Sequence, residues 1–292
     1  MLTMLLAGCV HPGAGGKLSD SPSGDAASAD SPASNTDSPT DSHSDSCIDS
    51  GCHPGFPPAY LAIPAYFYPD LGQPGSLWDE AMAVPEGPRV LVFNPNSGPG
   101  AAQDPAYLNM ATTATNQGDI TLLAYVSTSY GARDPNAVLA DIASYAAWYP
   151  VSGFFFDEAP GVETCDAAYA QYAAFADAAR LGVPGAFIAL NPGADTCDDY
   201  AEFADLLLTF EGDAATYATH TTAMTASPDH IWHLVYDAPE DSSGHAMFAA
   251  VDEARANGAG WLYVTDDTLP NPWDTLPAYL DDEATEASAL AE

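Results

Sequence analysis

Eight short apolar runs alternate with segments of helical spacing between residues 60 and 280, and this alternation limits the possible folds more than any other feature of the chain. The expected strands are 60–67, 89–93, 120–126, 153–156, 186–190, 205–210, 230–236 and 260–264. The expected helices are 76–84, 104–116, 135–148, 167–180, 198–203, 214–224, 243–257 and 272–280. Strand and helix units in this order, joined by short connections, favour a single (β/α)8 TIM barrel over an open doubly wound sheet.

Carboxylates follow two of these apolar runs at the point where each run ends. Asp157 and Glu158 come directly after three phenylalanines, and Glu211 ends the run that begins at residue 205. Such runs are typical of parallel strands, which are buried on both faces. Because the carboxyl ends of barrel strands open onto the same face, we expect the three acids to converge there.

A barrel mouth that holds several carboxylates, amides and tyrosines suits glycoside hydrolysis. One carboxyl group protonates the leaving oxygen, and a second attacks the anomeric carbon or activates water. We expect Asp157 to be the nucleophile, Glu211 the general acid/base and Glu158 an electrostatic or positioning partner, with the first two roles open to exchange. The polar and aromatic residues expected to bind substrate at strand ends are Tyr66, Asn94, Tyr125, Thr128, Tyr130, Asn191, Tyr236, Asp237 and Asp266.

Two other classes of function fit part of this pattern. The same barrel mouth could bind polysaccharide without cleaving it, as a structural or binding module, because a barrel fold does not dictate activity. The acids could also ligate Mg²⁺ or Ca²⁺ in a metal-dependent hydrolase, although the chain has no EF-hand spacing. His230 and His233 lie three apart on an expected strand and so point to opposite faces, which argues against zinc. We therefore expect neither a metal nor a cofactor.

The charge balance narrows the choice of partners. The chain has 41 acidic and 5 basic residues, a net charge of −36. A polyanionic surface repels nucleic-acid phosphates and anionic lipid headgroups, so neither is an expected partner. The acidity indicates a solvated surface of the kind found in salt-adapted proteins, attraction to a cationic polysaccharide, or both.

The chain divides into a leader, a linker, one domain and a short tail. Residues 1–9 end in Leu6-Ala7-Gly8-Cys9, which resembles a bacterial lipobox and makes Cys9 the expected lipidation site and the only membrane anchor. The leader is short and lacks a basic residue, so the start assigned to the chain is open to question. Residues 10–55 are rich in Ser, Asp and Pro and predict a disordered linker, 56–285 the barrel, and 286–292 a disordered tail. We expect an exported monomer at the cell surface or in the periplasm.

Four further cysteines support this location. Two disulfides would use Cys47, Cys52, Cys165 and Cys197 and would require an oxidising compartment. Four cysteines allow three pairings, and the sequence leaves the choice open.

Six ordered motifs together resemble the spherulin-4 family over residues 60–280. The motifs are 63–69 (IPAYFYP), 94–100 (NPNSGPG), 125–133 (YVSTSYGAR), 153–158 (GFFFDE), 191–193 (NPG) and 210–211 (FE). The family includes barrel enzymes of glycoside hydrolase family 135 that cleave α-1,4-linked galactosaminogalactan. The resemblance implies an acidic site at Asp157, Glu158 and Glu211 and an endo-acting hydrolase of a polysaccharide containing galactosamine.

Overall fold

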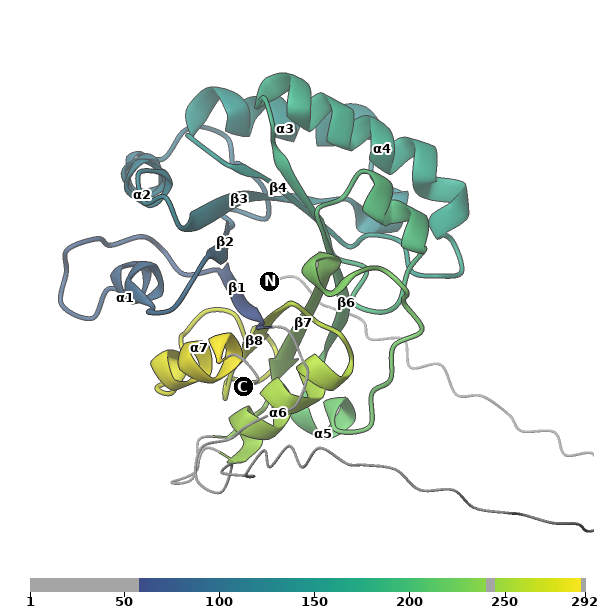
Figure 1. Ribbon diagram of the computed structural model, residues 1–292. Coiled ribbons are helices and arrows are strands. Elements are labelled where there is room, and N and C mark those ends of the chain that lie inside the picture. The colour runs from purple at the N-terminus through teal and green to yellow at the C-terminus, as the bar shows by residue number, and fades with distance from the viewer. Residues whose placement is uncertain (1–57, 240–244, 290–292) are drawn as a thin grey trace, which may run out of the picture. The chain divides into compact units, whose positions relative to one another are not determined.

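The computed structural model describes residues 58–239 and 245–289, which form a closed barrel with helices around it (Figure 1). Each strand pairs in parallel with the next, and the first strand pairs with the last. The predicted (β/α)8 TIM barrel is therefore confirmed. The predictions for Cys9, for the linker 10–55 and for Cys47 and Cys52 lie outside the described residues.

The strands agree closely with the runs read from the sequence. They are β1 (Tyr60–Ala65), β2 (Arg89–Phe93), β3 (Ile120–Ser127), β4 (Gly153–Asp157), β5 (Phe187–Leu190), β6 (Leu206–Asp213), β7 (Ile231–Tyr236) and β8 (Trp261–Val264). The helices are α1 (Leu77–Ala83), α2 (Pro105–Thr115), α3 (Pro135–Trp148), α4 (Cys165–Gly182), α5 (Ala214–Tyr217), α6 (His245–Ala256) and α7 (Leu280–Ser288). Three short 3₁₀ helices complete the described structure: η1 (Ser129–Gly131), η2 (Asp198–Glu202) and η3 (Pro228–His230).

Two helices begin with the same local device. The side chains of Asp104 and Asp134 each accept a hydrogen bond from a backbone N–H in the first turn of α2 and α3, respectively. In each case the next residue is proline, whose missing N–H would have had no partner at that position in any case. The start of both helices is therefore encoded within two residues.

Close packing at the start of β4 sets the height of the acids that follow it. A Cβ atom at Gly153 would lie 1.9 Å from the backbone oxygen of Phe187 in β5, so only glycine fits there. Farther along the barrel interior, the Phe155 ring contacts Tyr125 and Trp232, with ring centroids 6.1 and 5.5 Å apart, respectively. These rings lie below the mouth, and they make the ends of the strands a poorly hydrated place for a charge.

The helix predicted at 214–224 is wrong in its length. α5 ends at Tyr217, and the chain then runs past the β5–β6 connection, where two aspartates bind it. Asp195 accepts hydrogen bonds from Thr222 and from the next backbone N–H, and Asp198 accepts three from residues 225 and 226. The threonines in this segment have low helix propensity, and tertiary hydrogen bonds replace the helical ones.

The helix predicted at 272–280 is misplaced. Residues 265–279 form an irregular connection, and α7 starts only at Leu280. The prolines at 272 and 277 disfavour helical backbone in the residues before them. α7 continues to Ser288, so it includes the first residues of the segment predicted to be a tail. Among the described helices, none has both the length and the apolar character required to span a bilayer.

Candidate active site

Asp157 and Glu211 meet at the barrel mouth, on either side of one amide group. The side-chain nitrogen of Asn191 donates to Oδ1 of Asp157 at 2.7 Å and to Oε2 of Glu211 at 2.9 Å. These two oxygens are therefore at most about 5.6 Å apart, the sum of the two distances. The convergence predicted for these acids, which come from β4 and β6, is present in the structure.

A bulge in β6 turns Glu211 towards the mouth. Leu208 pairs with Trp232 of β7, but the next pair is Phe210 with His233, so one residue is left over. In a regular strand, residue 211 would point to the opposite face from Leu208. The extra residue reverses that phase, so that Phe210 packs outward on Tyr217 and Glu211 points inward.

Hydrogen bonds and burial act on Asp157 in opposite directions. Burial raises the pKa of its carboxyl group, and donors that bind the anion oppose this effect. The hydroxyl of Tyr125 donates to Oδ2 at 2.6 Å, and Asn191 donates to Oδ1. Both carboxylate oxygens therefore have donors, which favours the ionised form that a nucleophile requires.

The pKa of Glu211 is raised in the same direction as that of Asp157. Burial, together with the nearby charge of Asp157, raises the pKa of Glu211 to about 7, against hydrogen bonds from Asn191 and Trp273 that lower it. A carboxyl group with such a pKa holds its proton up to neutral pH and can give it to a leaving group. The two acids are therefore suited to different roles.

Trp273 is the site residue that the sequence did not indicate. It lies in the connection after β8, where a helix was predicted, and its side chain is 7% exposed. The indole lies edge-on to the ring of Tyr236, with ring centroids 6.2 Å apart. The Trp273 backbone carbonyl accepts a hydrogen bond from the backbone N–H of Tyr66 at 3.0 Å. No periodicity marks this residue. The only available signal was a tryptophan that follows Pro272 in the segment after the last barrel strand.

Glu158 faces away from the pair. Its Oε2 accepts hydrogen bonds from the Ser127 hydroxyl at 2.8 Å and from the Ser129 backbone N–H at 3.1 Å. Its backbone has a φ of 56°, in the left-handed region that non-glycine residues rarely adopt. Residues in such strained conformations are concentrated at functional sites. The Glu158 carboxylate is thus bound at the end of β3, although Glu158 directly follows Asp157 in the chain.

Other predicted residues line the mouth without touching the acid pair directly. Tyr66 lies edge-on to Tyr125, with ring centroids 5.7 Å apart, and burial raises its pKa. Tyr130 is 66% exposed at the rim, and its backbone N–H donates to the Glu158 carbonyl at 2.6 Å. Burial and then the charge of Asp213 raise the pKa of Tyr236 most, and the charge of Glu211 contributes further.

Four further predicted residues lie in other surroundings. The Thr128 hydroxyl is buried and donates to the backbone carbonyls of Asp157 and Glu158, so it secures the end of β4. Asn94 accepts from the Gly98 N–H at 3.1 Å and shapes its own loop. Asp237 lines a separate hollow between α5 and α6, of about 390 Å³. Asp266 is half-buried directly after β8.

Comparison with known proteins identifies the family of this chain. Residues 60–287 match the model of spherulation-specific family 4. The chain belongs to this family. Spherulin-4 of Physarum polycephalum is 29% identical over 253 residues, which cover 80% of this chain and 71% of that protein. The resemblance read from the motifs is therefore confirmed.

A solved structure supports the fold assignment. Sph3 of Aspergillus clavatus, crystallised in complex with GalNAc, matches with a TM-score of 0.69 and 24% identity, over 80% of this chain and 98% of that one. At this level of identity the match establishes that the two chains share the fold.

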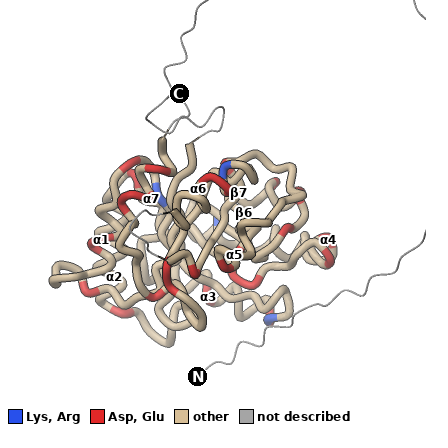
Figure 2. The backbone as a smooth tube through the Cα atoms, turned by 90° about the horizontal axis from the view of Figure 1, so that it is seen from below, with Lys and Arg blue, Asp and Glu red and all other residues tan. Residues whose placement is uncertain are grey.

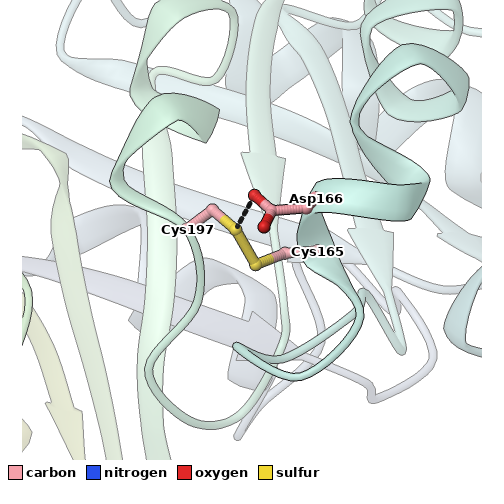
Figure 3. Close-up of side chains that lie close together, drawn as sticks. All are labelled: Cys165, Asp166 and Cys197. Atoms are coloured by element: carbon pink, nitrogen blue, oxygen red, sulfur yellow. Dashed lines mark hydrogen bonds between the residues drawn. A yellow bond between two sulfur atoms is a disulfide. The ribbon is translucent and has the colours of Figure 1, made fainter.

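In this member of spherulation-specific family 4, a disulfide joins the first residue of α4 to the connection that follows β5. Cys165 and Cys197 are bonded, with their Cα atoms 5.8 Å apart (Figure 3). This is one of the pairings left open by the sequence. The Asp166 carboxylate lies 3.3 Å from the Cys197 sulfur, and these three residues are the one group of potential metal ligands in the described ranges. A disulfide sulfur carries no thiolate charge, so the group is a poor metal site.

The acidic residues are spread over the elements visible in Figure 2, and basic residues are few. Each arginine of the described barrel is held by a carboxylate: Arg89 by Asp119, Arg133 by Asp141, Arg180 by Asp205 and Arg255 by Glu286. The arginines are therefore neutralised locally. The mouth that holds Asp157 and Glu211 keeps an excess of negative charge.

Proposed function

We propose that this chain is a glycoside hydrolase that cleaves a polysaccharide by double displacement at Asp157 and Glu211. The observation that supports the proposal most strongly is the amide bridge that holds their oxygens within about 5.6 Å of each other. Retaining glycosidases place their two carboxyl groups about 5 to 5.5 Å apart, whereas inverting enzymes need roughly 6.5 to 9.5 Å to admit a water molecule.

The proposed reaction has two steps. In the first, the Asp157 carboxylate attacks the anomeric carbon, the glycosidic C–O bond breaks, and the Glu211 proton passes to the departing oxygen. In the second, Glu211 takes a proton from water as that water attacks the same carbon, and the bond to Asp157 breaks. The raised pKa of Glu211 and the two donors to Asp157 favour this assignment over the exchanged one. Glu158, whose carboxylate is held at the end of β3, acts only through its charge, which contributes to the raised pKa of Asp157.

The substrate we propose is an α-1,4-linked polymer that contains galactosamine and is cleaved internally. Sph3, which shares the fold, was crystallised with GalNAc, and the chain carries an excess of acidic residues. Partial deacetylation would make such a polymer cationic and draw it to the negative mouth. Tyr66, which is half-buried, and Tyr130, which is 66% exposed, provide ring faces for the sugars there.

We also propose that the enzyme works outside the cytoplasm, anchored through a lipid on Cys9. The Cys165–Cys197 disulfide supports this location, because such bonds persist in oxidising compartments. Labelling of the expressed chain with a radioactive fatty acid tests the anchor, and Cys9→Ser should abolish the label.

The test of the activity uses purified chain and galactosamine-containing polymers of known acetylation. Product analysis by NMR should show sugars released with the same anomeric configuration as the substrate. Asp157→Asn and Glu211→Gln should each lower the rate by about 10³-fold or more. Asp213→Asn is the matched control, because this β6 residue caps α5 at Thr216, and it should keep nearly full activity. Binding without cleavage by the unaltered chain would identify a non-catalytic module instead, and inversion would refute the double displacement.

A further inference from the structure

The segment 191–193 is bonded to both strands that carry the acids. The Asn191 backbone N–H donates to the Phe156 carbonyl at 2.9 Å, and its carbonyl accepts from Ala159 at 2.7 Å. Two residues on, Gly193 donates to the Leu208 carbonyl at 3.1 Å and accepts from the Glu211 N–H at 3.2 Å. The segment therefore spans the gap between the end of β4 and the bulge of β6.

Gly193 is needed for this connection. Its φ is 67°, and a Cβ atom there would lie 3.7 Å from Oδ1 of Asn191 and 3.9 Å from Cβ of Glu211. Both distances are ordinary contacts, so the cost of a larger residue would come from the left-handed backbone conformation. The turn brings the Asn191 side chain under both acids.

The Asn191 side chain is committed to the acids and not to solvent. It is 8% exposed, and its nitrogen donates one hydrogen bond to each carboxylate, so both of its N–H bonds are used. Its Oδ1 is buried and has no hydrogen-bond partner in the described structure. The side chain thus leaves its own acceptor unsatisfied while it serves both carboxylates, although an unpaired buried acceptor costs free energy.

We propose that Asn191 is a positioning residue that holds Asp157 and Glu211 at the separation required for double displacement. This inference rests on the proposed function, because it assigns Asn191 to the acids and not to the sugar. The amide hydrogens lie between two carboxylates that would otherwise repel each other or share a proton. The bridge therefore allows one acid to stay ionised while the other stays protonated at the same short distance.

Two substitutions separate this role from ordinary packing. Asn191→Ala removes both donors and leaves a void, and Asn191→Asp keeps the shape but replaces the donor by a third carboxyl group. If Asn191 only filled space, the isosteric Asp variant would be the milder change. If it positions the acids electrostatically, the Asp variant should disturb their titration more, because it adds a like charge beside both.

The first readout does not depend on catalysis. Carboxyl ¹³C NMR titration of Asp157 and Glu211 in the full chain should show the Asp157 midpoint raised by roughly one pH unit in Asn191→Ala and by more in Asn191→Asp. Asn94→Ala, which removes a strand-end amide that binds Gly98 and not the acids, should leave both midpoints in place. Unchanged midpoints in both Asn191 variants would overturn the inference, whether or not the chain cleaves any polymer.

The second readout uses the reaction. In Asn191→Ala, kcat should fall by about 10²-fold with KM changed much less, since a small displacement of the reacting groups is enough for such a loss. The acid limb of the pH profile should move to higher pH by the same amount as the NMR midpoint. A higher KM with an unmoved pH profile would mean that Asn191 contacts the sugar, and it would refute the positioning role while leaving the proposed function intact.

Discussion

Two buried glutamates in this barrel show that burial raises the pKa of a carboxyl group but does not by itself make a catalytic site. Glu211 at the end of β6 and Glu283 in α7 both have a raised pKa because they are desolvated. Glu283 is fully buried, and its Oε1 accepts from the Val264 N–H at 2.8 Å. β8 pairs with β1 only at Trp261 and Leu262 within the described residues, so Glu283 serves as the partner that β8 lacks farther along.

The difference between the two glutamates lies in their neighbours. Glu211 faces another carboxylate, Asp157, and receives hydrogen bonds from Asn191 and Trp273 at the barrel mouth. Glu283 lies behind β8, and its Oε2 has no hydrogen-bond partner among the described residues. A raised pKa alone is therefore a weak indicator of catalysis, and a raised pKa beside a second acid at a strand end is a stronger one.

The largest expected effect is on activity. Glu211→Gln should lower kcat by about 10³-fold or more, because the variant cannot protonate the leaving oxygen. Glu283→Gln should keep kcat within about threefold, because the Gln side-chain oxygen still accepts from Val264 and the group lies outside the mouth. Steady-state hydrolysis rates on one polymer test this contrast. Equal losses in the two variants would break the comparison.

The next effect concerns the disulfide, which cross-links the Asp157 side of the barrel and has no described counterpart at α7. Replacing Cys165 and Cys197 together by serine should lower the free energy of unfolding by about 3 kcal/mol, mainly by freeing the unfolded chain. Urea denaturation measures this loss, with Cys-to-Ser changes at positions 47 and 52 as the control. A loss well below 1 kcal/mol would show that the hydrogen bonds between these two segments suffice.

The smallest effect is a stability difference that depends on pH. The folded pKa of Glu211, about 7, exceeds its ordinary value of 4.5, so the folded state binds more protons between these values. The free energy of unfolding should therefore fall as pH rises through this window, and the loss should be complete above it. Glu211→Gln removes this loss. The free energy of unfolding of the variant should therefore exceed that of the unaltered chain by an amount that grows up to about pH 7 and then levels off at about 1 to 3 kcal/mol.

Glu283 sharpens the same measurement. Burial raises the pKa of Glu283 well above its ordinary value, so the destabilisation that it causes begins near that ordinary value and extends to higher pH. The advantage of Glu283→Gln should therefore keep growing at a pH where that of Glu211→Gln has levelled off. Thermal unfolding of both variants between pH 4 and pH 9 gives the two curves. Superimposable curves would contradict the distinction drawn between the two sites.

Much of the fold follows from local sequence. The Asp-Pro starts at residues 104 and 134 and the three phenylalanines before Asp157 determine nearby structure with few alternatives. The strand-end rule also brought Asp157 and Glu211 together correctly, because in a closed parallel barrel chain position fixes which face a residue reaches.

The remainder depends on contacts between distant segments. The extent of α5 depends on hydrogen bonds from residues 222–226 to Asp195 and Asp198, which lie 27 or 28 residues before their partners in the chain. Trp273 reaches Glu211 from a loop that has no periodic pattern. The turning of Glu158 towards Ser127 and Ser129 requires knowledge of the β3 end. Local propensity carries no information on any of these.

The bulge in β6 has a consequence for the interpretation of related protein sequences. The inward direction of the carboxylate at 211 depends on where the strand accommodates one residue too many, and not on the identity of residue 211. If that irregularity moved past residue 211, the acid would face the outer layer while the barrel stayed closed. A glutamate aligned with this position in another genome is thus insufficient evidence for an intact catalytic pair unless the backbone phase is preserved as well.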